Sequence, residues 1–316
     1  MVRYTVTGAS GFIGANLVAR LKERNCFVRA VDIKDTPERE HLYSWADEVW
    51  TGCDLRDFGQ AARAVEGADR VFHLAADHGG AGYFYSDADM KAAINNLRID
   101  TNVLQGSIGQ GVDRLFFASS ACTYPVDVQG KGAAPLTEDL LGSGEGEQLY
   151  GFAKRMSTKL MEGARDHGFD ARSGVFHTIY GPSQDEEEPR AKFPTAVCRK
   201  IIENPERVEV WGDGSQVRTF LFIDDALDKI LTVMNEPYQG PVNVGSDEQV
   251  TVRECAVWVA DALGADPEWV YTDGPVGVAH RASDNAEWER RYGTSAKVTA
   301  KEGFGRLARF MDAHRR

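Results

Sequence analysis

Short runs of β-branched and aromatic residues alternate with longer amphipathic segments along the first part of the chain. Short apolar runs are typical of buried strands, and longer segments with apolar residues three and four apart are typical of helices. This alternation predicts a parallel sheet that is covered by helices on both faces. The predicted strands are residues 2–6, 28–33, 48–51, 70–75, 114–119 and 171–177, and the predicted helices are residues 12–23, 57–65, 90–109 and 149–167.

The pattern changes near residue 180. A stretch rich in Gly, Pro and acidic residues, 181–189, interrupts the alternation, and its acidic run 185–188 is predicted to be a solvated loop rather than a metal site. Beyond it, helices are predicted at 193–203, 252–263 and 300–314, and short strands at 208–211 and 242–244.

We interpret residues 1–180 as a Rossmann-type domain with a doubly wound parallel sheet, of class α/β. Residues 181–316 then form a smaller α/β lobe that binds the substrate. Residues 218–223 resemble a further strand, so we expect residues 218–236 to return to the first domain.

Composition and charge narrow the classes of function. The chain has 316 residues, of which 42% are hydrophobic and 27% charged, as in an ordinary globular protein. Its net charge of −12 disfavours nucleic-acid and anionic-lipid partners. No apolar run approaches a membrane span, and the N-terminus has no signal-peptide pattern. We therefore expect a cytoplasmic protein without a membrane partner.

The spacing of the cysteines and histidines predicts no metal site. The five cysteines are scattered and lack CxxC spacing, so they are predicted to be reduced thiols rather than zinc ligands or a disulfide framework. The histidines share no spacing typical of metal ligands.

A glycine-rich turn follows the first predicted strand and opens the first predicted helix. Glycines in such a turn allow a sharp bend and let a pyrophosphate approach the helix N-terminus. Asp32 ends the second predicted strand, where a carboxylate can accept both ribose hydroxyls of NAD and would repel the 2′-phosphate of NADP. Asp54, after the third strand, could accept from the adenine amine or belong to a turn. The residues expected at the NAD site are Gly8, Ser10, Gly11, Phe12, Ile13, Gly14, Asp32, Asp54, Leu55, Leu74, Ala75, Ala76, Tyr150 and Lys154.

Tyr150 and Lys154 are four residues apart on a predicted helix, so their side chains share one face. A lysine ammonium stabilises the phenolate of a neighbouring tyrosine, which can then take a proton from a sugar hydroxyl as hydride leaves the carbon. Ser120, at the end of the fifth predicted strand, could hydrogen-bond the same oxygen.

Together these motifs resemble the extended short-chain dehydrogenases/reductases, the family of nucleotide-sugar epimerases and dehydratases, over nearly the full chain. Within that family the chain is similar to the subfamily of GDP-mannose 3,5-epimerases. Five segments carry this resemblance: residues 76–82 (ADHGGAG), 119–125 (SSACTYP), 190–194 (RAKFP), 211–220 (WGDGSQVRTF) and 281–285 (RASDN).

The resemblance implies transient oxidation at C4 of a hexose, followed by proton exchange at C3 and C5. It assigns the proton transfers to Cys122 and Lys192 and also implies a homodimer that binds a GDP-hexose. A thiol ionises near enough to neutrality to serve in either protonation state. The residues expected to bind the substrate are Gly79, Gly80, Gly82, Asn95, Asn102, Thr178, Lys192, Trp211, Gln216, Arg218 and Arg281.

Other readings remain open from the sequence. Thr178, His78, Ala81 and Ala279 differ from the residues usual in the subfamily, and they surround the expected sugar site. The main alternative is a simple nucleotide-sugar 4-epimerase, which needs Tyr150 and NAD but no second acid/base pair. A 4,6-dehydratase is disfavoured because Ala121 and Cys122 replace the Asp-Glu pair of such enzymes. A non-catalytic NAD-binding protein is the remaining alternative.

Overall fold

The computed structural model describes residues 1–36, 39–184, 190–237, 240–293 and 296–314. Its main feature is a seven-stranded sheet in the order β10-β6-β5-β4-β1-β2-β3, in which all neighbouring strands are parallel. This confirms the predicted Rossmann-type fold. The strands are β1 (Arg3–Thr7), β2 (Phe27–Val31), β3 (Glu48–Trp50), β4 (Arg70–His73), β5 (Arg114–Ser120), β6 (Asp170–Phe176) and β10 (Val242–Val244).

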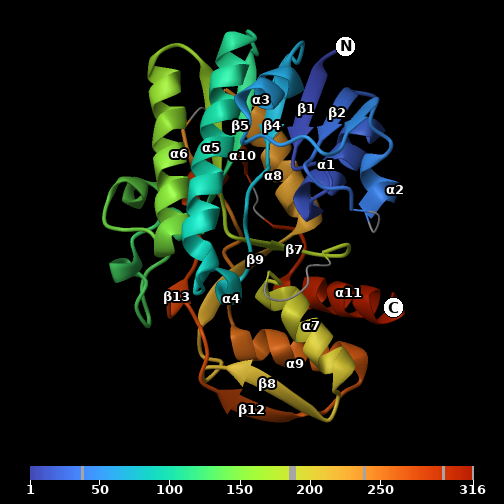
Figure 1. Ribbon diagram of the computed structural model, residues 1–316. Helices are drawn as coiled ribbons and strands as arrows, with labels where there is room; N and C mark the ends of the chain where they lie inside the picture. The colour runs from blue at the N-terminus through green and yellow to red at the C-terminus, as the bar shows by residue number, and fades with distance from the viewer. Residues whose placement is uncertain (37–38, 185–189, 238–239, 294–295, 315–316) are drawn as a thin grey trace.

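Helices cover both faces of this sheet (Figure 1). Successive residues of β5 face opposite sides, as a pleated strand requires: Phe116 packs in the core cluster of α1 and α8, and Phe117 in the cluster of α3. The long helices α5 and α6 lie side by side on the second face. The helices are α1 (Phe12–Glu23), α3 (Phe58–Val65), α5 (Ala88–Gly109), α6 (Gln148–Asp166) and α8 (Ile223–Asn235).

The smaller lobe lies at the carboxyl end of the large sheet and contains two small sheets (Figure 1). α9 begins with a capping box, in which the Thr251 hydroxyl accepts from the Glu254 backbone and the Glu254 carboxylate accepts from Thr251. The helices of the smaller lobe are α7 (Phe193–Glu203), α9 (Val252–Leu263), α10 (Ala286–Tyr292) and α11 (Ala300–Ala313). It also contains the parallel strands β8 (Arg207–Trp211) and β12 (Glu268–Thr272).

The strand predicted at 218–223 exists as β9 (Val217–Phe222), but it does not return to the large sheet. It pairs with β7 (Thr178–Tyr180), β11 (Gln249–Thr251) and β13 (His280–Arg281) in a separate four-stranded sheet. In contrast, α8 packs against α1, and β10, which we expected in the smaller lobe, pairs with β6 in the large sheet. An apolar pattern predicts a strand but does not specify the strand with which it pairs.

Among the described residues, no helix combines the length and the apolar character that crossing a lipid bilayer requires. The acidic run 185–188, for which the sequence predicts a solvated loop, lies outside the described residues.

Candidate active site

The turn between β1 and α1 requires glycine at two positions. Gly8 has a φ angle of +70°, and a Cβ atom there would lie 2.8 Å from the backbone nitrogen of Ala75. A Cβ atom on Gly14 would lie 2.0 Å from the Gly8 carbonyl oxygen. A side chain at Gly14 would therefore push α1 away from the turn, and one at Gly8 would meet the backbone at Ala75, so either would disturb the helix N-terminus whose N–H groups bind phosphate.

A cavity of about 120 Å³ extends from this turn to the N-terminal part of α6. Its glycine cradle fits the pyrophosphate of NAD, and its other end reaches the tyrosine and lysine expected to act beside the nicotinamide. The predicted NAD-binding residues that line it are Gly8, Gly11, Phe12, Ile13, Gly14, Leu74, Ala76, Tyr150 and Lys154.

Asp32 lies just beyond β2 and is held by the backbone. Its Oδ2 atom accepts from the Ser10 N–H at 3.0 Å, and its Oδ1 atom accepts from the Lys34 N–H at 2.9 Å. These bonds fix a carboxylate beside the glycine turn, which is the position that binding of the adenosine ribose requires.

Five predicted NAD residues do not line this cavity: Ser10 and Asp32, described above, and Asp54, Leu55 and Ala75, which have local roles in the structure. The Asp54 carboxylate forms an ion pair with Arg56, at 2.7 Å, rather than standing free for an adenine amine. Leu55 is buried in the core beside α3, and Ala75 packs against Gly8. Sequence spacing did not reveal that Arg56, two residues further on, forms an ion pair with the Asp54 carboxylate.

Tyr150 is buried at the N-terminal end of α6. Its ring stacks on Phe84 of the short helix α4 (Ala81–Phe84), with ring centroids 4.2 Å apart. Burial raises the pKa of Tyr150 above its usual value, and a hydrogen bond with the Ser120 side chain opposes this rise. The structure thus brings together the tyrosine and serine that the sequence predicted from separate segments.

Lys154 is buried one turn further along α6, and its ammonium has an anionic partner that the sequence analysis missed. Lys154 Nζ lies 3.4 Å from Asp100 Oδ2, while Asp100 Oδ1 lies 3.0 Å from His73 Nε2. Burial disfavours ionisation of Asp100, but Lys154 and His73 together hold its pKa below the usual value. The ammonium also lies 4.6 Å from the centroid of the Phe117 ring. Asp100 therefore stabilises a charged lysine inside the protein.

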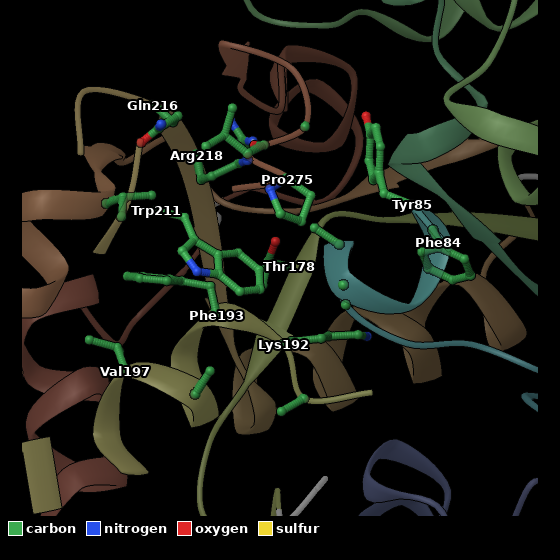
Figure 2. A pocket seen from close by; sticks show the side chains of 18 of the residues that line it. Phe84, Tyr85, Thr178, Lys192, Phe193, Val197, Trp211, Gln216, Arg218 and Pro275 are labelled. Atoms are coloured by element: carbon green, nitrogen blue, oxygen red, sulfur yellow. The ribbon is translucent and has the colours of Figure 1, made fainter. Parts of the chain in front are cut away.

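A second cavity, of about 280 Å³, adjoins this centre between the two lobes. Lys192, the N-cap residue of α7, lines both cavities. Figure 2 shows Trp211, Phe193 and Val197 toward one side of this cavity, and Phe84 and Tyr85 toward the other. The predicted catalytic and substrate residues that line it are Gly79, Gly80, Gly82, Cys122, Thr178, Lys192, Trp211, Gln216, Arg218 and Arg281.

Cys122 lies in a short 3₁₀ turn, Ala121–Thr123, directly after β5. Its Sγ atom is 3.6 Å from Glu147 Oε2 and 3.5 Å from Arg281 Nη1. Burial raises the pKa of the Cys122 thiol, which Arg281 lowers and Glu147 raises further. The chain is no longer extended at Cys122, yet the turn still directs the thiol into the cavity.

The two arginines expected to bind pyrophosphate line the cavity but already have protein partners. Arg281 pairs with Glu147 at 2.8 Å. Arg218 donates to the carbonyls of Val276 and Val278, and burial lowers its pKa to about 10. The buried Nη2 group of Arg281 has no hydrogen-bond partner among the described residues, so it remains available to a ligand.

Asn95 and Asn102, predicted to bind substrate, line neither cavity. The Asn95 amide donates to Asp77 Oδ2 at 2.8 Å, and the Asn102 amide donates to the Leu55 carbonyl at 3.0 Å. Both side chains fix loops against α5, and the prediction that they bind the ligand directly is not supported. Their positions on a predicted helix did not indicate which way they face.

Residues at the site that the sequence analysis missed include Phe84, Tyr85, Asp100, Glu147 and His73. Each of two residues had one signal in the sequence: Asp100 lies on α5, two residues before Asn102, and Glu147 is the N-cap residue of α6, three residues before Tyr150. Neither position reveals its contact: Asp100 meets Lys154 only when α5 packs against α6, and Glu147 meets Cys122 only when α6 packs against the turn Ala121–Thr123.

Comparisons with known proteins agree with this geometry. The NAD dependent epimerase/dehydratase family matches residues 4–245. GDP-mannose 3,5-epimerase 1 of Oryza sativa subsp. japonica is 35% identical over 305 residues, covering 96% of this chain and 79% of the relative. GDP-mannose 3,5-epimerase of Arabidopsis thaliana is 35% identical over 306 residues, covering 96% and 80%. The structure of UDP-glucose 4-epimerase from Thermotoga maritima, solved with UDP-glucose, superposes with a TM-score of 0.88, covers 99% of each chain and is 24% identical. On this evidence the chain belongs to the NAD dependent epimerase/dehydratase family.

Proposed function

We propose that this protein is a GDP-hexose 3,5-epimerase that acts on GDP-mannose or a close relative. The observation that carries the proposal is that Cys122 and Lys192 line one cavity, and that Lys192 also lines the neighbouring cavity together with Tyr150. These two groups come from segments 70 residues apart, and a simple 4-epimerase has no need of them. The GDP-mannose 3,5-epimerases at 35% identity support the choice of nucleotide.

The redox half of the reaction uses Tyr150, Ser120 and Lys154. When bound, NAD supplies a reversible hydride acceptor for C4 of the sugar. Tyr150 takes the proton of the C4 hydroxyl as the hydride leaves, and returns it in the final reduction. Ser120 hydrogen-bonds the same oxygen, and the buried Lys154 ammonium favours the phenolate form.

The inversion half uses Cys122 and Lys192. A ketone at C4 acidifies the hydrogens at C3 and C5, so that a base can remove one and an acid can return a proton on the opposite face. Lys192 lines both cavities and Cys122 lines the second, larger cavity. A sugar ring bound there would have two proton-exchanging groups beside it.

Incubation with GDP-mannose in deuterated water tests this function. We expect deuterium at C3 and C5 of the recovered sugar nucleotide, measured by NMR. The absence of label at both carbons would remove the proposal. The variants C122A and K192A distinguish the 4-epimerase alternative, because a 4-epimerase would retain turnover in both, and a 4-keto-6-deoxy product would indicate a dehydratase.

We also propose a homodimer and a cytoplasmic location. Large apolar side chains are exposed along neighbouring faces of α5 and α6, including Ile94, Phe152, Met156 and Leu160. The five cysteines are free thiols, as in a reducing compartment.

A further inference from the structure

The thiol of Cys122 lies between a carboxylate and a guanidinium. Its hydrogen-bond distance to Glu147 Oε2 is 3.6 Å, and Arg281 Nη1 lies 3.5 Å from its sulfur. Arg281 also lies 2.8 Å from the same Glu147 oxygen. The guanidinium charge is therefore shared with Glu147 rather than being available to a thiolate alone.

The Glu147 carboxylate is fixed from two further directions. Glu147 is the N-cap residue of α6, three residues before Tyr150. The Tyr85 hydroxyl, from the residue after α4, donates to Glu147 Oε1 at 2.8 Å. Burial disfavours ionisation of Glu147, yet Arg281 and the Tyr85 hydroxyl hold its pKa below the usual value. The carboxylate is thus an anion with a fixed position next to the thiol.

Among the described residues, the charged and titratable groups around the thiol come from four elements. Arg281 comes from β13, Arg218 from β9, Glu147 and Tyr150 from α6, and Tyr85 from the end of α4. Arg218 is occupied by the Val276 and Val278 carbonyls. The Ser120 hydroxyl oxygen accepts from the Cys122 backbone N–H. Glu147 is the anion that contacts the sulfur.

We propose that Glu147 is a positioning residue that holds Cys122 as a protonated thiol, with its S–H directed at Oε2, so that Cys122 meets the sugar as a proton donor. A thiolate would place two negative charges at this distance in a buried site, which is unfavourable. On donation, the S–H group turns from Glu147 Oε2 to the enolate carbon, the S–H bond breaks, the enolate electron pair forms the new C–H bond, and the S–H electron pair stays on sulfur beside Arg281. The role in inversion rests on the proposed function, whereas the protonation state does not.

Alkylation of Cys122 by iodoacetamide tests the proposal without any sugar, because only the thiolate reacts. The NAD-loaded full-length enzyme is labelled over a series of pH values, and the Cys122 peptide is quantified by mass spectrometry, which separates it from Cys26 and Cys53. In wild type we expect the rate to rise into the alkaline range without a plateau near neutrality. In Glu147→Gln, Arg281 is freed to pair with the thiolate, so the rate near neutral pH should increase about tenfold or more, which corresponds to about one pKa unit.

Glu209→Gln is the matched control, because Glu209 lines the same cavity, and its carboxylate accepts from the Thr272 hydroxyl instead. It should leave Cys122 labelling unchanged. An unchanged or slower rate in Glu147→Gln contradicts the proposal. If that variant does not fold, the pH profile of Cys122 alkylation in wild type still tests the protonation state, since a plateau near neutral pH would mean that Cys122 is already a thiolate. If the protein proves not to catalyse 3,5-epimerisation, the alkylation rates of wild type and Glu147→Gln still report the protonation state of Cys122. Failure of the proposed function can therefore be distinguished from failure of this proposal.

Discussion

The rings of Phe84 and Tyr150 are stacked, with centroids 4.2 Å and planes 22° apart. Phe84 ends the short helix α4, which follows the glycine loop at Gly79 and Gly80, so the stack joins this loop to the proposed catalytic tyrosine. A Cβ atom on Gly80 would lie 2.3 Å from the Ala191 carbonyl oxygen, and the Gly80 N–H donates to the Arg190 carbonyl at 2.9 Å. The same loop is therefore also held against the segment that carries Lys192.

Removal of this stack should weaken catalysis. Aromatic pairs contribute about 0.5–1.5 kcal/mol beyond their buried area, so Phe84→Ala should lower kcat/KM roughly twofold to tenfold through a less fixed Tyr150 ring. Because burial is what raises the pKa of Tyr150, the ionisation of Tyr150 should also move to lower pH in the variant. Steady-state kinetics over a range of pH measure both effects. Phe84→Tyr, which keeps a ring, should behave as wild type, and equal kinetics in both variants would argue against a role for stacking.

The glycine turn gives a prediction for NAD affinity. In Gly14→Ala the added Cβ would meet the Gly8 carbonyl at 2.0 Å, so α1 must move and NAD binding should weaken by roughly tenfold or more. Gly163→Ala is a suitable control, since a Cβ at this helical position has no neighbour within 4 Å. It should leave NAD affinity unchanged and raise the free energy of unfolding by about 0.5–1 kcal/mol. Isothermal titration calorimetry of both variants measures the affinities, and tight binding by Gly14→Ala would show that the turn tolerates a side chain.

Asp100 gives a prediction for stability and its dependence on pH. Asp100→Asn leaves the buried Lys154 without its anion, which should lower the free energy of unfolding by about 3–5 kcal/mol. The pKa of Asp100 is lower in the folded state than in the unfolded state. Its contribution is therefore fully present above the unfolded-state pKa, near 4, and is lost as the pH falls through the folded-state pKa. The difference between wild type and variant should shrink in that acid range.

Urea unfolding at a series of pH values measures this difference. Asp113→Asn, a change at an exposed aspartate, should have almost no effect at any pH. A constant difference between wild type and Asp100→Asn down to strongly acidic pH would show that the carboxylate charge does not stabilise Lys154.

The proposed dimer face can be tested at Phe152, whose side chain on α6 is 51% exposed. Phe152→Glu places a charge in the middle of the apolar face and should convert a dimer into a monomer, measured by size-exclusion chromatography with light scattering. Phe58→Glu changes a ring of similar exposure, 45%, at the start of α3, and should leave the mass unchanged. A wild-type protein that elutes as a monomer would contradict the proposed dimer directly.

Local signals in the sequence were enough to predict most elements of the fold. Residues 12–23, 193–203 and 252–263 are helices with the predicted bounds, because apolar spacing and end residues such as Thr251 act within a few positions. The partners of β9 and β10 could not be predicted, since pairing depends on contacts between distant segments.

In the candidate site, too, residues with local sequence signals were predictable and contacts between distant segments were not. Gly8, Gly14, Tyr150 and Lys154 were predictable because their spacing itself has a chemical meaning. Asp100, by contrast, becomes a partner of Lys154 only when α5 packs against α6. Asn95, on the same helix as Asp100, faces Asp77 instead, and helical spacing gave no reason to prefer one over the other.

The position of β10 affects how the polypeptide must be made. The large sheet is completed by residues 242–244, and one face of it is covered by α8, so a nascent chain released near residue 180 would present the edge of β6 to solvent. Open strand edges of this kind recruit other chains and lead to aggregation. The two lobes are therefore not separable pieces, and an attempt to express the nucleotide-binding half alone should yield insoluble material unless residues up to 244 are included.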